Sequence, residues 1–158
     1  MKKHLLFQVG LLMISIAVFS QPSGPTSHTN SGYSPLLPAL CGPYNVGAGQ
    51  AYTTLTSAII DLNARGVSCP VSFILTDNVY ASETFPITIG TVTGTSFTNT
   101  VTIKPGTGKT PTITGSSTSA ILILNGSKYI IIDGSNSGGS DKSLTWANTK
   151  YYNQYLYY

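Results

Sequence analysis

Four short apolar runs lie within about 34 residues, at positions 101–134 (VTIKPGTGKTPTITGSSTSAILILNGSKYIIIDG). They are separated only by residues that interrupt regular structure, namely Pro, Gly, Ser, Thr and the pairs Asn-Gly and Asp-Gly. No segment between the runs could hold a crossover helix of the usual length. The pattern therefore predicts strands stacked as the coils of a solenoid.

The hydrophobic period supports this prediction. From Val71 onward, apolar residues alternate with Ser and Thr, as in half-buried strands. Residues 120–124 and 129–132 are continuous apolar runs, which are typical of parallel strands covered on both faces. The Asn125-Gly126 pair between them fits either a hairpin or a corner between coils. We favour the corner, because four residues separate the two runs.

Residues 53–64 predict one helix of about three turns, because Leu and Ile recur there on one face at helical spacing. Thr53 or Thr54 can cap its start and Gly66 can cap its end. Stacked repeats bury a core only against their neighbours, so this helix is suited to cap the first coil. We expect an all-β fold, a right-handed parallel β-helix of few coils with one N-terminal capping α-helix.

The N-terminal part of the chain reads as a leader. Residues 1–20 have the form of a secretory signal peptide, with a basic start and a short apolar run, and the run is short for a transmembrane anchor. Residues 21–43 contain five prolines among Ser, Gly, Thr and Asn, as in a flexible linker. We therefore predict a secreted or cell-surface protein whose β-helix segment covers residues 44–148.

Composition excludes some partners and predicts a disulfide. Residues 21–158 carry six basic and five acidic side chains, so they offer no basic patch for nucleic acid. The segment GTGKT at residues 106–110 lacks the first glycine and the helix of a phosphate-binding loop, so we expect a turn there and no nucleotide. Cys41 and Cys69 are the only cysteines, and in an exported protein such a pair predicts a disulfide, with two free thiols as the alternative.

Two acidic pairs are the candidates for chemistry. Asp77 and Glu83 bracket one loop, and Asp133 and Asp141 bracket the loop GSNSGGSD. Either pair could serve as acid and base on a sugar, or hold Ca²⁺ with backbone carbonyls, and the second pair is our candidate calcium site. The alternative is that these carboxylates cap turns, since Asp before Gly is common at corners.

Aromatic residues are the candidates for glycan contact. Tyr80, Tyr129 or Trp146 could stack on a sugar ring. Five of the ten tyrosines lie in the last eight residues, within an atypical tail at residues 149–158. The tail could be an aromatic strand that stacks on carbohydrate or aggregates. Our interpretation is instead that the chain is cut short, or that its reading frame is lost near Trp146.

The stretch VGAGQAYTTLTSAI at residues 46–59 resembles the opening of pectin-lyase-like right-handed β-helix proteins. The runs LNARGVSCPVSFILTDNVY, ETFPITI, NTVTIKPGTGKTPTITGSS, AILILNGSKYIIIDGSNSGG and LTWAN resemble the N-terminal part of large secreted or surface β-helix proteins of Bacteroidetes. The resemblance covers residues 44–148 and implies a part of a longer protein. The chain lacks the Asp and Arg set of pectin esterases and the Gly-His-Gly of polygalacturonases, so no catalytic residue is carried over.

Two functions follow as hypotheses. The first is a non-catalytic exported scaffold, adhesin or glycan-binding surface, whose Thr, Ser and Asn faces offer hydroxyls and amides to polysaccharide. The second is the N-terminal fragment of a polysaccharide lyase or glycoside hydrolase, whose catalytic coils lie beyond this chain.

Overall fold

The computed structural model describes residues 37–150, and the predicted signal peptide, most of the predicted leader and the Tyr-rich end of the tail lie outside this range. The described part is mostly strands, with one helix. In chain order the elements are β1 (Leu40–Val46), α1 (Leu55–Arg65), β2 (Val67–Leu75), β3 (Val79–Tyr80), β4 (Ile87–Ile89), β5 (Val101–Pro105), β6 (Thr112–Gly115), β7 (Leu122–Leu124), β8 (Ile130–Ile132) and β9 (Thr145–Asn148).

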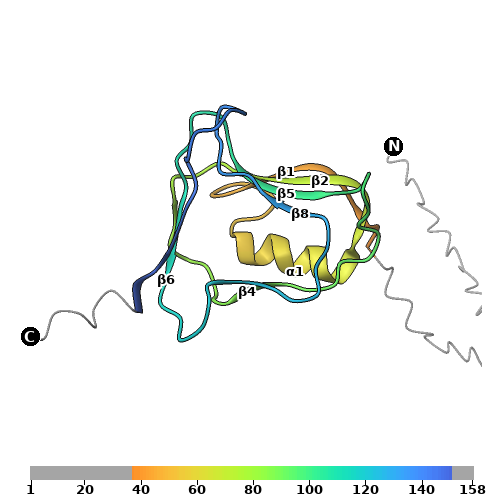
Figure 1. Cartoon of the computed structure of the whole chain (residues 1–158), viewed down its shortest axis with the longest axis horizontal. Coiled ribbons are helices and arrows are strands. Elements are labelled where there is room, and N and C mark those ends of the chain that lie inside the picture. The colour runs from red at the N-terminus through yellow and green to blue at the C-terminus, as the bar shows by residue number, and fades with distance from the viewer. Residues whose placement is uncertain (1–36, 151–158) are drawn as a thin grey trace, which may run out of the picture. The chain divides into compact units, whose positions relative to one another are not determined.

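The strands form three sheets in which every pairing is parallel. Sheet A has the order β1-β2-β5-β8, sheet B has β3-β6-β9, and sheet C has β4-β7. The chain passes through sheets A, B and C in turn, and we call each passage a row: β2, β3 and β4 form the second row, and β5, β6 and β7 the third. Figure 1 shows sheets A, B and C on different sides of the interior.

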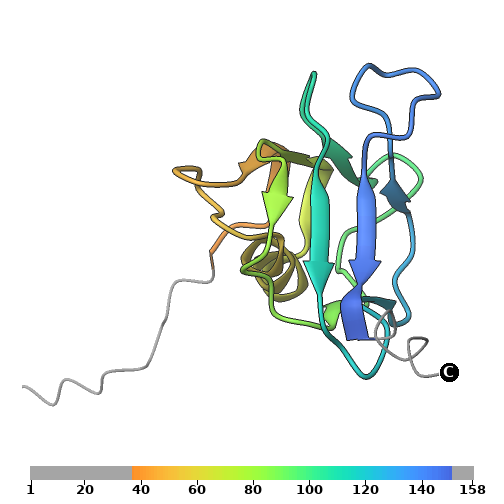
Figure 2. The same ribbon diagram turned by 90° about the vertical axis from the view of Figure 1, so that its left-hand side faces the viewer.

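In the first row, α1 takes the place of strands in sheets B and C. It follows β1 directly and packs against β1, β2 and β4. Its buried side chains are Leu55, Ala58, Ile59 and Leu62. Figure 1 places the helix between sheet A and β4, and Figure 2 shows it beside β3, with β6 and β9 farther away. The helix therefore covers the apolar interior of the second row.

The helix was predicted within one or two residues at each end. Thr54 is its N-cap and accepts a hydrogen bond from the Ser57 N–H at 3.1 Å. Gly66 ends it with φ of 67°, a conformation that glycine adopts without steric cost, and its N–H donates to the Leu62 carbonyl at 2.9 Å. The apolar spacing and the two caps thus identified this element correctly.

Because the strands pair in parallel and in register, equivalent positions of successive strands stack on one another. In sheet A, Tyr44 pairs with Phe73, Phe73 with Ile103, and Ile103 with Ile132. Phe73 and Ile103 are fully buried, whereas Ser72 and Ile74 on β2 are half-buried. The alternation predicted from Val71 onward is therefore observed, and its inward set forms the hydrophobic core.

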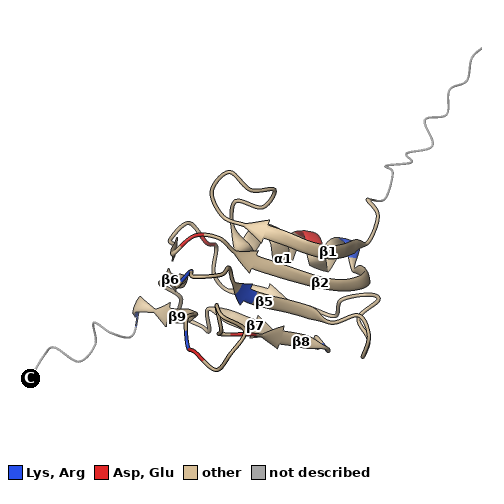
Figure 3. Ribbon diagram, turned by 90° about the horizontal axis from the view of Figure 1, so that it is seen from above, with Lys and Arg blue, Asp and Glu red and all other residues tan. Residues whose placement is uncertain are grey.

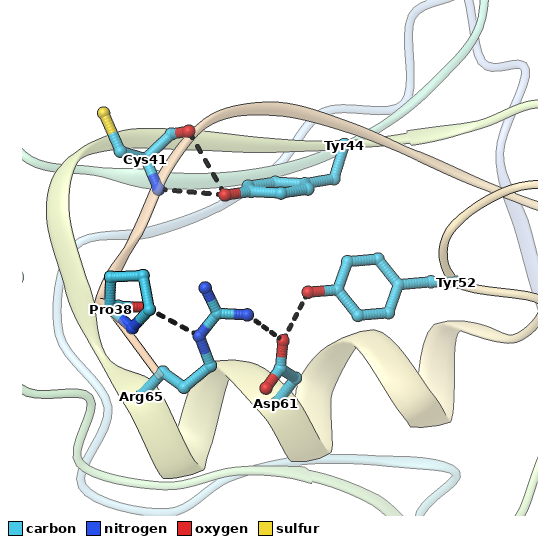
Figure 4. A network of polar contacts seen from close by, with 6 residues as sticks. All are labelled: Pro38, Cys41, Tyr44, Tyr52, Asp61 and Arg65. Atoms are coloured by element: carbon cyan, nitrogen blue, oxygen red, sulfur yellow. Dashed lines mark hydrogen bonds and ion pairs between the residues drawn. The ribbon is translucent and has the colours of Figure 1, made fainter. Parts of the chain in front are cut away.

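A disulfide joins the first two strands of sheet A. Cys41 on β1 and Cys69 on β2 are bonded, as predicted. Beside it, the Tyr44 hydroxyl lies 3.2 Å from both the N–H and the carbonyl of Cys41. The Arg65 Nε donates to the Pro38 carbonyl at 2.7 Å, which ties the end of α1 to the entry of β1 (Figure 4).

Two expectations need adjustment. The first strand begins at Leu40, inside the segment predicted as leader, because it pairs with β2. The apolar runs at residues 120–124 and 129–132 are not covered on both faces, since Leu124, Ile131 and Ile132 are exposed. Among the described residues, β7 and β8 are also the last strands of sheets C and A. The corner at Asn125-Gly126 is confirmed, since β7 pairs with β4 and β8 with β5.

We expect Phe73→Ala to lower the free energy of unfolding by about 3–5 kcal/mol, because it removes a fully buried ring from the centre of the core. Phe97→Ala is the matched control, since Phe97 is 87% exposed and its truncation should change stability by less than about 0.5 kcal/mol. Urea unfolding of both variants checks this. Equal losses in the two variants would contradict the burial pattern.

Candidate functional site

Two surface grooves are lined by residues of the turns and loops that follow the strands of sheet A. The larger, of about 500 Å³, is lined by residues of the turn before α1 and of the segment that follows β2. The smaller, of about 260 Å³, is lined by the end of β5, its following turn and the loop GSNSGGSD. Figure 3 shows that charged residues are sparse and lie mainly on α1, at the end of β5 and in loops. Each groove contains two of these charges.

Glu83, in the larger groove, binds the start of α1. Its carboxylate accepts hydrogen bonds from the N–H groups of Leu55 at 2.7 Å and Thr56 at 2.6 Å, and from the Thr56 hydroxyl. The first N–H groups of a helix lack partners within the helix, and negative charge is favoured there. The carboxylate therefore acts as a long-range cap, which corresponds to the capping alternative of the sequence analysis.

Asp77, the other acid of this groove, holds the turn before the helix. Its Oδ2 accepts from the Ala48 N–H at 2.6 Å. A Cβ at Gly47 would lie 2.4 Å from the Thr76 Oγ1, so the turn passes too close to this segment for a side chain. Both acids of this pair, for which acid–base, calcium-binding and capping roles were considered, thus hold backbone N–H groups in position.

Tyr80, a predicted glycan contact, is among the residues that line the larger groove, but it is mostly buried in the hydrophobic core. The residue is only 4% exposed, and its hydroxyl donates to the Val46 carbonyl at 2.6 Å. Burial raises the pKa of this hydroxyl above its ordinary value. The ring is part of the hydrophobic core, and a glycan contact at Tyr80 stays a prediction.

A second network of polar contacts holds the C-terminal half of α1 in place. Asp61 accepts from the Tyr52 hydroxyl and forms an ion pair with Arg65 at 2.7 Å (Figure 4). Burial, together with the hydrogen bond to Asp61, raises the pKa of Tyr52 above its ordinary value. Tyr52 also packs edge-on against Tyr44 and Phe73. The network joins the helix to the aromatic part of the core.

The smaller groove brings together polar groups from two rows. Lys104 comes from β5, Thr107 from the turn after it, and Asp133, Asn136 and Ser137 from the loop after β8. Of these, only Asp133 was singled out from the sequence. Lys104 could have been found from the strand alternation, which places it on the outward set between Ile103 and Pro105. The volume is below the roughly 300–1,000 Å³ of sites that enclose drug-sized ligands, so the groove suits surface contact.

Asp141 organises the loop that forms one wall of this groove. Its carboxylate accepts hydrogen bonds from the hydroxyls of Ser135, Ser137 and Ser143, and from the Asn136 N–H at 3.0 Å. These hydroxyl donors, together with that N–H, lower the pKa of Asp141 well below its ordinary value. The side chain of Asn136 donates to the Lys109 carbonyl at 2.7 Å, which fastens the loop to the neighbouring row.

The candidate calcium pair lies in this loop, but its two carboxylates have separate local roles. Asp133 accepts from the Ser135 N–H at 2.9 Å, as in a turn, and Asp141 accepts from three serines. Among residues 37–150 no group of three or more Asp, Glu, His or Cys side chains is placed to hold a metal. Calcium binding by Asp133 and Asp141 stays a prediction.

The two remaining aromatic candidates, Tyr129 and Trp146, lie in the fourth row, whose described strands are β8 and β9. Tyr129 is 47% exposed and has a φ of 59°, an uncommon conformation for a residue with a side chain. Trp146 is partly buried against the core, above Ile113. Neither residue lines one of the two grooves. Tyr129 offers an accessible ring, whereas most of the Trp146 ring is engaged in packing.

The fold and the grooves define a small β-rich protein with parallel sheets and one helix. No family model matches the chain, and neither a curated protein nor a solved structure matches it. In residues 37–150, no helix is both long and apolar enough to cross a membrane.

We expect Glu83→Ala to lower the free energy of unfolding by about 1–2 kcal/mol, because two N–H groups at the start of α1 lose their acceptor. Ser82→Ala, on an exposed neighbour, is the control and should be nearly neutral. Chemical denaturation measures both. The capping role is refuted if the two variants unfold at the same denaturant concentration.

Asp141 should titrate below the ordinary aspartate pKa of about 3.9. Because its pKa is lowered on folding, ionised Asp141 stabilises the loop at neutral pH, and this contribution is lost as the pH falls below about 4. The amide proton of Asn136 reports this in an NMR titration, and Asp141→Asn should remove the transition. Lys142→Ala should leave it unchanged. A midpoint at or above the ordinary value would contradict the serine contacts.

Proposed function

We propose that this chain is the capped N-terminal segment of a right-handed parallel β-helix of the pectin-lyase-like kind, which serves as a non-catalytic exported scaffold and presents a polar surface to glycans. The observation that carries the proposal is the set of parallel ladders in three sheets, entered by the chain in the same order in successive rows. Few strands are needed for such an architecture, because each row buries its core against the next.

The hydrogen bonds of the carboxylates favour a scaffold over an enzyme whose active site lies in the described rows. Glu83, Asp77 and Asp141 accept hydrogen bonds from backbone N–H groups, and Glu83 and Asp141 also from hydroxyls. Asp61 is paired with Arg65. A general acid and base would need carboxylates aimed at a substrate across an open cleft. The acids described here are used to hold turns and a helix.

The smaller groove is the part of the surface best suited to a sugar. Lys104 and Asn136 offer N–H donors, Asp133 offers acceptor oxygens, and Thr107 and Ser137 offer hydroxyls. Hydroxyl-rich ligands are recognised by such mixed donors and acceptors. Tyr129, exposed in the same row as Asp133, supplies an aromatic face for stacking elsewhere on a long polysaccharide.

The second candidate, the start of a polysaccharide lyase or hydrolase, is favoured by one observation. The inward side chains Leu124 and Ile132 are exposed on the last strands of sheets C and A, which suits continuation by further coils. Catalytic groups would then lie on those coils. Activity assays on the longer protein, if one is encoded, would favour this candidate over the scaffold.

We expect the exported chain to bind at least one member of a polysaccharide array, and Lys104→Ala to weaken that binding about tenfold or more, because it removes a charged hydrogen-bond donor from the groove. Lys128→Ala is the matched control, since Lys128 is exposed and lies outside the groove. Absence of binding to every polysaccharide would overturn the glycan role. Equal weakening by both variants would overturn the assignment to this groove.

A further inference from the structure

The loop that connects β4 to β5 presents an aromatic ring to solvent. This loop, residues 90–100 (GTVTGTSFTNT), contains two apolar side chains, Val92 and Phe97. Val92 is 4% exposed and belongs to the hydrophobic core, whereas Phe97 is 87% exposed. Burial therefore accounts for Val92, but the ring of Phe97 contributes nothing to the core.

Both ends of this loop are fastened to the second row. The Val67 N–H donates to the Thr93 carbonyl at 2.8 Å, and the Val71 N–H donates to the Thr100 carbonyl at 2.9 Å. A Cβ at Gly94 would lie 1.9 Å from the Val67 carbonyl oxygen, so the two backbones approach too closely for a side chain there. The loop is consequently held at a fixed place on the surface.

Hydrogen bonds also order the tip of the loop. Ser96 and Asn99 exchange two N–H to carbonyl hydrogen bonds, at 3.2 Å each, and Phe97 lies between them in the chain. The Asn99 side chain donates to the Gly94 carbonyl at 3.3 Å. The ring is thus carried by an ordered backbone, and a ligand that binds it loses little affinity to the ordering of this loop.

A second exposed ring comes from the same corner of the next row. The Val101 N–H donates to the Tyr129 carbonyl at 3.0 Å, which places Tyr129 beside the start of β5. Tyr129 is 47% exposed and has a φ of 59°. This left-handed conformation is costly for a residue with a bulky side chain, and backbone strain of this kind clusters at functional sites. Glycine would fit the backbone more easily, so the position retains an accessible ring at a cost.

We call residues 92–100 and 127–129 together the aromatic corner. Around the two rings it carries Ser, Thr and Asn side chains, and Lys128 is its one charged residue. The aromatic corner lies at the start of β5 and β8, whereas the smaller groove lies at and beyond the ends of these strands. The two places are therefore separated by the length of the strands of sheet A.

We propose that the aromatic corner is a second glycan-contact site, in which Phe97 and Tyr129 stack on uncharged sugar rings. The inference rests on the proposed glycan role and adds to it a place and a ligand class. A sugar ring has a face of C–H groups that can pack on an aromatic face, while its hydroxyls bond to hydroxyls and amides such as those of the corner. A ligand without charge suits a corner that offers no carboxylate and a single ammonium group.

The test titrates the intact oxidised protein with uncharged β-linked hexasaccharides of glucose, mannose and xylose, by calorimetry. We expect at least one of them to bind, and Phe97→Leu to weaken that binding about tenfold or more, because leucine keeps an apolar side chain but has no flat face. Phe97→Trp should retain the affinity within about threefold, because it restores a ring. Ile60→Ala is the matched control, since Ile60 is an exposed apolar residue of α1, and it should change binding by less than about twofold.

Tyr129→Gly separates recognition from folding. Glycine adopts a positive φ without steric cost, so we expect this variant to melt at a temperature no lower than that of the unchanged protein. The same variant should bind the hexasaccharide at least about fivefold more weakly, because one of the two rings is lost. A stable variant with weakened binding would show that the ring serves recognition.

Three outcomes would overturn the proposal. Equal affinity of the unchanged protein and of Phe97→Leu would show that the ring does not stack on the sugar, while the glycan role at the smaller groove would stand. Binding of charged polysaccharides without any uncharged hexasaccharide would remove the ligand class and leave the glycan role intact. A Tyr129→Gly variant that melts at a lower temperature and binds as tightly as the unchanged protein would show that this ring is structural.

Discussion

The structure depends on the in-register parallel pairing of successive rows. Because equivalent positions lie on top of one another, Phe73 packs between Tyr44 and Ile103 in a column that continues to Ile132. Each inward residue is buried by the rows on both sides of it, and a row with only one neighbour is left partly open. In sheet A, the inward side chains Phe73 and Ile103 of the second and third rows are consequently fully buried, whereas Ile132 in the fourth row is exposed.

The same constraint explains why the two ends are built differently. At the first row, α1 lays Leu55, Ile59 and Leu62 over the interior, and it is fixed there by Glu83 at its start and by Arg65 at its end. These contacts join residues that are 27 or 28 positions apart, about one row. The disulfide between Cys41 and Cys69 spans the same interval of 28 positions. Glu83 and the disulfide therefore hold the first row to the second, whereas the Arg65 contact joins the two parts of the first row, α1 and the entry of β1.

Local patterns predicted the elements well, and long-range contacts account for what they missed. The alternation after Val71 and the caps Thr54 and Gly66 were readable from neighbouring residues, and the disulfide was predicted because Cys41 and Cys69 are the only two cysteines. The burial of Tyr80 was not, because its hydroxyl bonds a carbonyl 34 positions away on another strand. Likewise, the apolar run at β8 could not reveal that it occupies the last strand of sheet A, since its composition resembles that of a buried strand.

In the smaller groove, too, local sequence predicted the loop, but not the long-range contacts that order it. The loop GSNSGGSD was recognisable as a loop, but its order comes from Asp141, which gathers three serine hydroxyls, and from Asn136, which reaches the Lys109 carbonyl in the preceding row. A loop built in this way is held in position without using Lys104 or the Thr107 hydroxyl, which come from the third row. In a fold whose inward positions are committed to stacking, such corners are where side chains remain available for recognition.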